Sequence, residues 1–363
     1  MSQRPRLEAP SGRRAELYRD LPSGRVQCTA CARLCQIGEG QVGFCGIRGV
    51  TGGELYLLDY GRIMAAHIDP IEKKPVVHYH PGSKILSVAT SGCSWACRFC
   101  QNYDISQRRQ PDGIEETPEH LVSLALSNGC EGIAYTYNQP SVFIEYARDV
   151  GRLARSKGIF NIFVSNGYDT PEAVGAMGEF LDCITVDFKG SGETGFVRRY
   201  VSIPNSDPIF QTMLEIKKRT KIHIEVTDLV VPEVGDSLDA AKSMCDWIYD
   251  NLGPDTPVHF LRFHPDYKMM DLPQTPVETL QRHIEVGRKS GLNYVYIGNV
   301  PGHPDESTYC PGCKKVLIKR FGYQILGYNL DSKNRCRFCG YSTTIVGPLS
   351  KSHREERFLP VIN

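Results

Sequence analysis

The sequence predicts an α/β fold with a large parallel sheet, preceded by a small Cys-rich layer and followed by a four-Cys module. Short apolar runs, each bounded by turn residues, recur at 84–90, 132–137, 160–165, 182–188, 221–227, 258–262 and 293–297. Helical stretches separate these runs, and strands that alternate with helices form a parallel sheet. Periodicity leaves two architectures open, an open doubly wound sheet and an incomplete (β/α) barrel.

The predicted helices have clear ends. A hydroxyl that precedes a proline can cap a helix starting at that proline, and a glycine can close a helix at its carboxyl end. The residues placed to do so are Thr117, Thr170, Thr275, Gly129, Gly158 and Gly291. No Gly-x-Gly-x-x-Gly sequence follows the first predicted strand, which weakens the case for a dinucleotide-binding sheet.

Length and charge limit the number of domains and the kinds of partner that the chain can have. Its 363 residues can form one large domain with small appendages, and we predict units at 1–82, 83–304, 305–345 and 346–363. The net charge of +1 gives no general attraction for nucleic acid or an anionic membrane. No apolar stretch approaches the roughly 20 residues of a membrane helix, and the polar start 1–14 lacks the apolar core of a secretory signal. We therefore predict a cytoplasmic protein.

Cysteines supply the strongest functional signal. Eleven of the fourteen fall in three tight clusters with metal-ligand spacing, which is typical of metal sites in a reducing compartment. The middle cluster is a C-x3-C-x2-C run, Cys93, Cys97 and Cys100, directly after the first predicted strand. Three thiolates suit a [4Fe–4S] cluster with one iron left open, and an open iron can chelate a substrate or cofactor. A zinc site would need a fourth ligand, which nothing next to Cys100 supplies.

This run, with Phe99 before its third cysteine, resembles the signature of the radical S-adenosylmethionine (radical SAM) superfamily. The resemblance implies a partial (β/α)6-type TIM barrel with the cluster loop after its first strand. It implies that the amino and carboxylate groups of S-adenosylmethionine (SAM) bind the open iron, and that the reduced cluster cleaves SAM to a 5′-deoxyadenosyl radical. A reductant such as flavodoxin or ferredoxin would be a partner.

Polar residues follow the predicted strands at corresponding places. In a barrel, the loops at the carboxyl ends of the strands build the site. Such loops occur at 135–140, 165–168, 187–190, 225–228, 262–265 and 298–302. Their recurrence in the same relative place favours a shared cavity.

The same runs, together with 69–75 and 100–102, resemble the AmmeMemoRadiSam-system radical SAM enzymes, which are related to pyruvate formate-lyase activating enzymes. The resemblance extends from about residue 25 to 345. By position it directs Gln139 to the SAM amino group, although members of that group tend to have glutamate there and a neutral amide gives no charge-assisted bond. It directs Ser165 and Asn166 to the ribose or carboxylate, and Asp187 and Lys189 to the cofactor or substrate side. The cofactor-binding candidates are Phe99, Asn102, Tyr137, Gln139, Ser165, Asn166, Asp187, Lys189, Arg262 and His264.

The C-terminal cluster has two C-x2-C hooks with 22 residues between them, Cys310 and Cys313, then Cys336 and Cys339. Two such hooks complete a tetrahedron around zinc with no open position, which indicates a structural site. A rubredoxin-like iron site and a nucleic-acid-binding ribbon are the alternatives.

The N-terminal cluster, Cys28, Cys31, Cys35 and Cys45, has irregular gaps in a glycine-rich stretch. Four thiolates can bind zinc or a second iron–sulfur cluster, and the C-x2-C hook slightly favours zinc. We predict a structural metal site that ties the N-terminal layer to the barrel.

Together these patterns predict a radical SAM enzyme that abstracts hydrogen from a small molecule, a peptide or a glycine of a partner enzyme. One alternative is an RNA-modifying or RNA-binding metalloprotein that docks through its terminal Cys modules, for which salt-dependent RNA affinity would be the sign. Another is a non-catalytic metal or redox carrier, which SAM cleavage by the reduced protein would exclude.

Overall fold

A nine-stranded sheet forms the centre of the computed structural model, which describes all residues except 1–6, 8–10, 356–357 and 363. The predicted polar start and the predicted tail therefore lie partly outside the described residues. Seven strands of the sheet are parallel: β9 (Lys84–Ala89), β11 (Gly132–Tyr135), β12 (Phe160–Ser165), β13 (Cys183–Lys189), β14 (His223–Val230), β15 (Val258–Arg262) and β16 (Val295–Gly298). Each coincides with a predicted apolar run, so the α/β class is confirmed.

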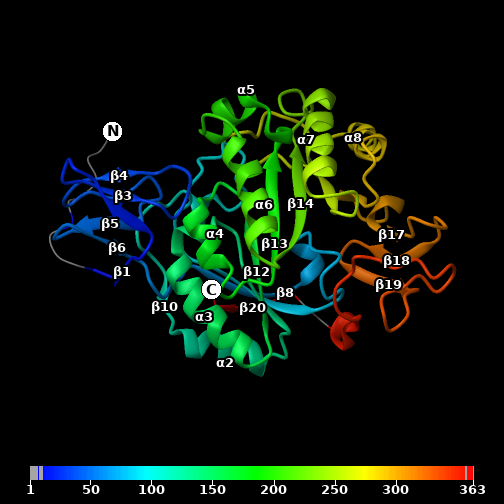
Figure 1. Cartoon of the computed structure of the whole chain (residues 1–363), viewed down its shortest axis with the longest axis horizontal. Coiled ribbons are helices and arrows are strands. Elements are labelled where there is room, and N and C mark those ends of the chain that lie inside the picture. Colours follow the sequence, from blue (N-terminus) through cyan, green and yellow to red (C-terminus); the bar gives the residue numbers. More distant parts are fainter. Residues whose placement is uncertain (1–6, 8–10, 356–357, 363) are drawn as a thin grey trace.

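One helix connects each parallel strand to the next. In chain order these are α2 (Pro118–Ser127), α3 (Ile144–Ser156), α4 (Pro171–Met177), α6 (Asp207–Arg219), α7 (Leu238–Asn251) and α8 (Val277–Lys289). Two shorter helices, α1 (Tyr103–Ser106) and α5 (Thr194–Phe196), lie in loops that follow β9 and β13. In Figure 1, α4 and α6 lie in front of β12 and β13.

Most of the predicted helix ends are confirmed, and one is wrong. Thr117 and Thr170 accept hydrogen bonds from backbone N–H groups three residues later, as caps do. The predicted closing glycines all have positive φ just beyond their helices. Thr275 does not cap α8. Its hydroxyl instead donates to the Val230 carbonyl at 2.6 Å and accepts from the Phe263 N–H at 2.9 Å, so it joins the ends of β14 and β15.

The central sheet remains open, with β16 at one edge and β20 (Leu359–Ile362) at the other. Between β20 and β9 lies β8 (Ala65–Pro70), which is antiparallel to both. Residues 71–83, here named the floor segment, connect β8 to the start of β9. The Glu225 carboxylate of β14 accepts hydrogen bonds from the backbone N–H groups of Val77 and His78, and Tyr296 of β16 contacts the His78 ring. The floor segment thus crosses the amino ends of the parallel strands.

Small sheets form the N-terminal layer, which appears in blue in Figure 1. The first contains β1 (Arg13–Arg14), β6 (Glu54–Leu57) and β5 (Arg48–Thr51), and the second contains β2 (Tyr18–Asp20), β3 (Val26–Cys28) and β4 (Gln36–Ile37). A third pairs β7 (Arg62–Ile63) with β10 (Ile114–Glu115). The layer docks on α3 through Arg48, which forms a buried ion pair with Glu145 and donates to the Val142 carbonyl at 2.8 Å.

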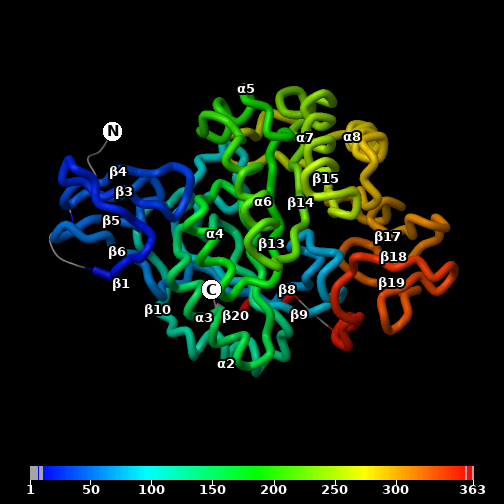
Figure 2. The backbone as a smooth tube through the Cα atoms, in the orientation of Figure 1, coloured from blue at the N-terminus to red at the C-terminus, as the bar shows by residue number. Residues whose placement is uncertain are grey.

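The C-terminal module contains β17 (Thr308–Tyr309), β18 (Val316–Phe321) and β19 (Gln324–Tyr328). Figure 2 shows the chain returning from this module to the centre of the molecule, where β20 lies beside β8. The predicted boundaries remain untested. However, β8 belongs to the unit predicted for 1–82 and β20 to the unit predicted for 346–363, and both strands pair within the central sheet. Backbone pairing thus links segments that are distant in sequence.

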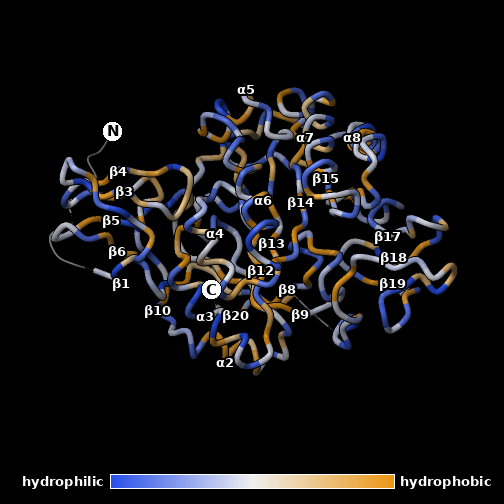
Figure 3. Tube along the Cα trace, in the orientation of Figure 1, coloured by the Kyte–Doolittle hydropathy of each residue, from blue (hydrophilic) through white to orange (hydrophobic). Residues whose placement is uncertain are grey.

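Hydrophobic residues concentrate where elements pack together, as along β8 and β9 in Figure 3. Within the described part of the chain, none of the helices combines the length and the apolar character needed to cross a membrane.

The Arg48–Glu145 pair gives a test of how the N-terminal layer docks. We expect Glu145→Ala to lower the free energy of unfolding by roughly 3–5 kcal/mol, because it leaves the buried Arg48 guanidinium without its counter-charge. Urea denaturation of wild type and variant measures the loss. Lys242→Ala, which removes an exposed pair with Asp246, is the control and should leave the urea midpoint unchanged. Equal stability of Glu145→Ala and wild type would contradict this account of docking.

Candidate active site and metal centres

A cavity of about 370 Å³ lies at the carboxyl ends of the parallel strands, and all thirteen residues predicted for the catalytic cluster and the cofactor line it. They are Cys93, Cys97, Cys100, Phe99, Asn102, Tyr137, Gln139, Ser165, Asn166, Asp187, Lys189, Arg262 and His264. The structure therefore brings together residues from five strand ends, those of β9, β11, β12, β13 and β15, while the individual role of each remains a prediction.

The loop that carries the three cysteines is held by side chains from outside it. Nδ2 of the buried Asn138 lies 2.9, 3.2 and 2.7 Å from the carbonyl oxygens of Thr90, Ser91 and Gly92. Asp59 accepts from the Ser91 N–H at 3.3 Å and from its hydroxyl at 3.1 Å. These contacts fix the backbone just before Cys93.

The spacing of the sulfur atoms distinguishes the cysteine sets. Four thiolates at about 2.3 Å from one zinc ion lie about 3.8 Å from one another. In the C-terminal set, Sγ of Cys310 is 3.6 Å from Sγ of Cys339, and Sγ of Cys313 is 3.7 Å from Sγ of Cys336, so these four match a tetrahedral ion. Among the described residues, this is the one set whose ligand atoms all lie within 4.8 Å of one another.

Cys93, Cys97 and Cys100 line the cavity, and their sulfur atoms do not all lie within 4.8 Å of one another. Such spacing is compatible with an iron–sulfur cube, since each thiolate binds a different iron. Burial raises the pKa of the Cys97 and Cys100 thiols above the usual value, and the Ser106 hydroxyl beside Cys100 partly offsets this. Without a metal these thiols therefore favour the protonated form, and a bound metal would hold them as thiolates.

An ammonium–carboxylate pair lies beside these thiols. Nζ of Lys189 is 2.6 Å from Oδ2 of Asp187, and the Thr227 hydroxyl donates to Oδ1 of Asp187 at 2.7 Å. Burial alone would lower the pKa of Lys189, but Asp187 and the nearby thiols raise it above its usual value. Lys189 thus stays protonated, and in the cavity wall it lies next to the Asp187 side chain.

The amide of Gln139 is occupied by protein partners. Its Nε2 lies 2.9 Å from oxygens of Ser141, Ser165 and Asp169, and its Oε1 accepts from the Asn166 N–H at 2.8 Å. Burial raises the pKa of Asp169 to about 6. The amide therefore braces the loops after β11 and β12, and Asp169 is a residue that the sequence pattern did not reveal.

Further cavity residues were missed because they lie outside the strand-end runs. Lys74 of the floor segment is buried against Asp69, with Nζ at 2.7 Å from Oδ2, and the Tyr137 hydroxyl donates to the same oxygen at 2.9 Å. Burial opposes ionisation of Asp69, but Lys74 and Lys73 hold its pKa below the usual range. Tyr323 of the C-terminal module also lines the cavity. The run 69–75, which is part of the family resemblance, thus also contributes Lys73, Lys74 and Pro75 to the cavity wall.

The N-terminal cysteines, Cys28, Cys31, Cys35 and Cys45, line one small cavity of about 10 Å³. No three of them have sulfur atoms within 4.8 Å of one another. The other thiols, Cys130, Cys183 and Cys245, are buried in the core.

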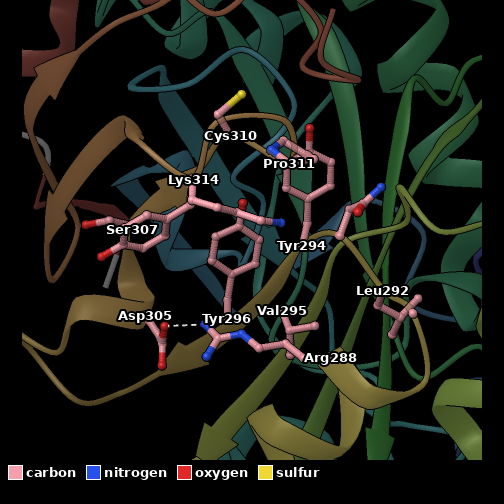
Figure 4. A pocket seen from close by; sticks show the side chains of 13 residues that line it. Arg288, Leu292, Tyr294, Val295, Tyr296, Asp305, Ser307, Cys310, Pro311 and Lys314 are labelled. Atoms are coloured by element: carbon pink, nitrogen blue, oxygen red, sulfur yellow. Dashed lines mark hydrogen bonds and ion pairs between the residues drawn. The ribbon is translucent and has the colours of Figure 1, made fainter. Parts of the chain in front are cut away.

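A larger hollow of about 560 Å³ lies between α8, β16 and the C-terminal module (Figure 4). Its lining includes Tyr294, Tyr296, Lys314 and the Arg288–Asp305 ion pair. It contains one thiol, Cys310, and none of the predicted catalytic residues.

The sequence model of the radical SAM superfamily matches residues 87–248. Over 338 residues the chain is 41% identical to an uncharacterized protein of Methanocaldococcus jannaschii, MJ0808, a match that covers 92% of this chain and 99% of that protein. A second uncharacterized protein of the same organism, MJ0674, is 24% identical over 296 residues, covering 74% of this chain and 76% of that protein.

Two solved structures are similar at 14% identity. One is a radical SAM methyltransferase from Sphaerobacter thermophilus, with a TM-score of 0.49, covering 65% of this chain and 71% of that chain. The other is a domain of a pyruvate-formate lyase-activating enzyme from Bacteroides vulgatus, with a TM-score of 0.41, covering 46% of this chain and 99% of that chain.

The raised pKa of Asp169 predicts how stability depends on pH. A carboxyl group whose folded pKa lies above its unfolded value contributes stability below the unfolded pKa, and this contribution is lost as the pH rises through the folded pKa. We expect wild type to lose roughly 1–2 kcal/mol relative to Asp169→Asn between pH 5 and pH 7, because Asp169 becomes charged while buried. Urea unfolding of both proteins across this range measures the difference. Parallel pH profiles would contradict the assignment.

Proposed function

Because the chain belongs to the radical SAM superfamily, we propose that it is a radical SAM enzyme of the AmmeMemoRadiSam group, similar to activating enzymes, with Cys93, Cys97 and Cys100 as ligands of its catalytic cluster. The observation that supports this is the single cavity where these thiols and the ten other predicted residues meet. When bound and reduced, a [4Fe–4S] cluster supplies the electron that cleaves SAM to a 5′-deoxyadenosyl radical, which abstracts hydrogen from a substrate. A cytoplasmic location is part of the same proposal.

The cavity has groups suited to a zwitterionic cofactor. Lys189 can bind a carboxylate and Asp187 can bind an ammonium group, and Thr227 keeps Asp187 oriented for that contact. Two buried polar atoms of cavity residues, Oδ1 of Asn138 and Nε1 of Trp95, have no hydrogen-bond partner within the described part of the chain. A buried polar atom without a partner is costly, so these atoms are an acceptor and a donor available to a bound ligand.

The remaining wall can hold the substrate. Arg262, His264 and Asn299 line the cavity from the ends of β15 and β16, and Tyr323 adds an aromatic ring from the C-terminal module. Phe99 packs against Phe196 and Phe263, which places apolar rings beside the cysteine loop. The proposed substrate classes are those that the sequence predicts: a small molecule, a peptide or a glycyl-radical-type partner.

Reductive SAM cleavage tests this proposal. Anaerobically reconstituted wild type, reduced with dithionite, should form 5′-deoxyadenosine, whereas a Cys93→Ala, Cys97→Ala, Cys100→Ala variant should form none, because its catalytic ligands are gone. Chromatography of the quenched reaction measures the product. Cys130→Ala is the matched control, since this thiol is buried away from the cavity, and it should retain the activity. Formation of 5′-deoxyadenosine by the triple variant would overturn the assignment.

We further propose that Cys310, Cys313, Cys336 and Cys339 bind zinc, which their sulfur spacing supports. A Cys336→Ser, Cys339→Ser variant should lose about one zinc per chain and keep its iron, because a tetrahedral zinc ion needs all four thiolates. Elemental analysis by plasma mass spectrometry measures both metals. Loss of the iron–sulfur absorbance with retention of zinc would show that this set holds iron instead.

A further inference from the structure

The N-terminal cysteines lie against the catalytic loop, and their sulfur spacing differs from that of the C-terminal set. We propose that Cys28, Cys31, Cys35 and Cys45 bind a second iron–sulfur cluster of the cubane type, placed to pass an electron to the catalytic cluster. The electron-transfer role rests on the proposed function, whereas the metal assignment does not.

The four thiols meet in one protected place. Cys28 ends β3, its N–H donates to the Cys35 carbonyl at 3.0 Å, and the glycine-rich loop that follows brings Cys45 to the same cavity. Three of the thiols are buried and Cys35 is half-buried. Four cysteines from a stretch of 18 residues therefore surround one small space, which is the arrangement of a metal site rather than of unrelated core thiols.

Sulfur spacing favours iron over zinc, the two metals that the sequence left open at the N-terminal set. The C-terminal set has the close spacing of a tetrahedral zinc site, at 3.6 and 3.7 Å. The N-terminal set has no three sulfurs within 4.8 Å of one another, and the three catalytic cysteines share this property. A cube presents its irons at separate corners, so its thiolates stand farther apart than those around one ion. The geometry thus reverses the slight preference for zinc.

Positive charge lies beside the thiols. Arg48, which is 1% exposed, and Arg33 both line the cavity, and because Arg48 is already paired with Glu145, Arg33 is the cation better placed to offset the thiolates. A buried anionic group requires such partners. Arg33 lies near Cys31, Cys35 and also Cys93 of the catalytic set, so one guanidinium faces both sites.

Backbone contacts join the two sites directly. The Cys45 carbonyl oxygen is so close to Gly92 that a Cβ there would lie 2.4 Å from it, and Gly92 has a φ of +76°. Arg33 donates to the Ser94 carbonyl. Arg109 donates to the Phe44 carbonyl at 2.7 Å and to the Cys93 carbonyl at 3.2 Å. The backbone around Cys45 and the backbone around Cys93 are therefore in direct contact, and Arg109 binds both.

The proposed step transfers one electron. A low-potential one-electron donor, such as a reduced flavodoxin-type or ferredoxin-type protein, is oxidised as the N-terminal cluster is reduced. The N-terminal cluster is then reoxidised as the same electron moves to the catalytic cluster. No bond forms or breaks and no proton moves in this step.

Metal content of the cysteine triple variant tests the site without depending on activity. The Cys93→Ala, Cys97→Ala, Cys100→Ala protein, reconstituted anaerobically with iron and sulfide, should keep about four irons per chain and an electron paramagnetic resonance signal after reduction. It should also keep about one zinc at the C-terminal set. About two zinc ions and no iron would overturn the proposal, and so would one zinc and no further metal.

Two additions to the triple variant serve as a matched pair. Adding Cys28→Ser and Cys31→Ser should remove the remaining iron, whereas adding Cys310→Ser and Cys313→Ser should leave it in place. Iron that survives the first addition would show that the N-terminal cysteines do not hold it. Circular dichroism of both proteins establishes that each retains its sheet.

Electron transfer has its own test. In fully reduced wild type the two clusters are neighbours, so their resonance signals should be broadened relative to the sum of the signals of the two single-cluster variants. An unbroadened sum would overturn the electron-transfer role while leaving the metal site intact. Failure of wild type to cleave SAM, with iron still present in the triple variant, would count against the proposed function and not against this site.

Discussion

The contact between the Asn138 amide and three consecutive carbonyl groups, those of Thr90, Ser91 and Gly92, is the constraint on which the site depends. A loop that leaves a strand end has unpaired backbone groups, and burying them without partners is costly. One side chain, from the loop that follows β11, contacts all three carbonyl groups and fixes the turn before Cys93. The position of the cysteine loop is therefore set by β9 and β11 together, and Asp59 of the N-terminal layer adds a further contact to Ser91.

The location of the site could be predicted from the sequence, because parallel strands place their carboxyl ends at one edge of the sheet. That rule alone brings Tyr137, Asp187 and Arg262 to a common cavity. The rule does not indicate which of these side chains are already hydrogen-bonded to other groups of the protein. Gln139 bonds to Ser141 and Asp169, and Thr275 joins two strand ends instead of capping a helix. Both outcomes depend on contacts between loops, which local patterns do not encode.

Long-range backbone pairing explains most of what the sequence could not reveal about the fold. Residues 65–70 and 359–362 pair in the central sheet although nearly the whole chain separates them. The strands of the N-terminal layer are two to four residues long, too short for a period of two to be recognised. By contrast, each strand of the parallel sheet is a local apolar run separated from the next by a helix, so the sequence alone predicts this sheet.

The cysteine sets show the same division between local pattern and tertiary geometry. Hooks of the form C-x2-C serve zinc and iron alike, so spacing along the chain leaves the metal open at the N-terminal set. The distances between sulfur atoms distinguish the sets, because the ligands of a single ion lie close to one another and the ligands of a cube lie farther apart. The N-terminal layer also contributes Asp59, Arg33 and the Cys45 carbonyl to the surroundings of the catalytic loop. The N-terminal layer thus packs directly against the loop that carries Cys93, and Arg33 lies near cysteines of both the N-terminal and the catalytic set.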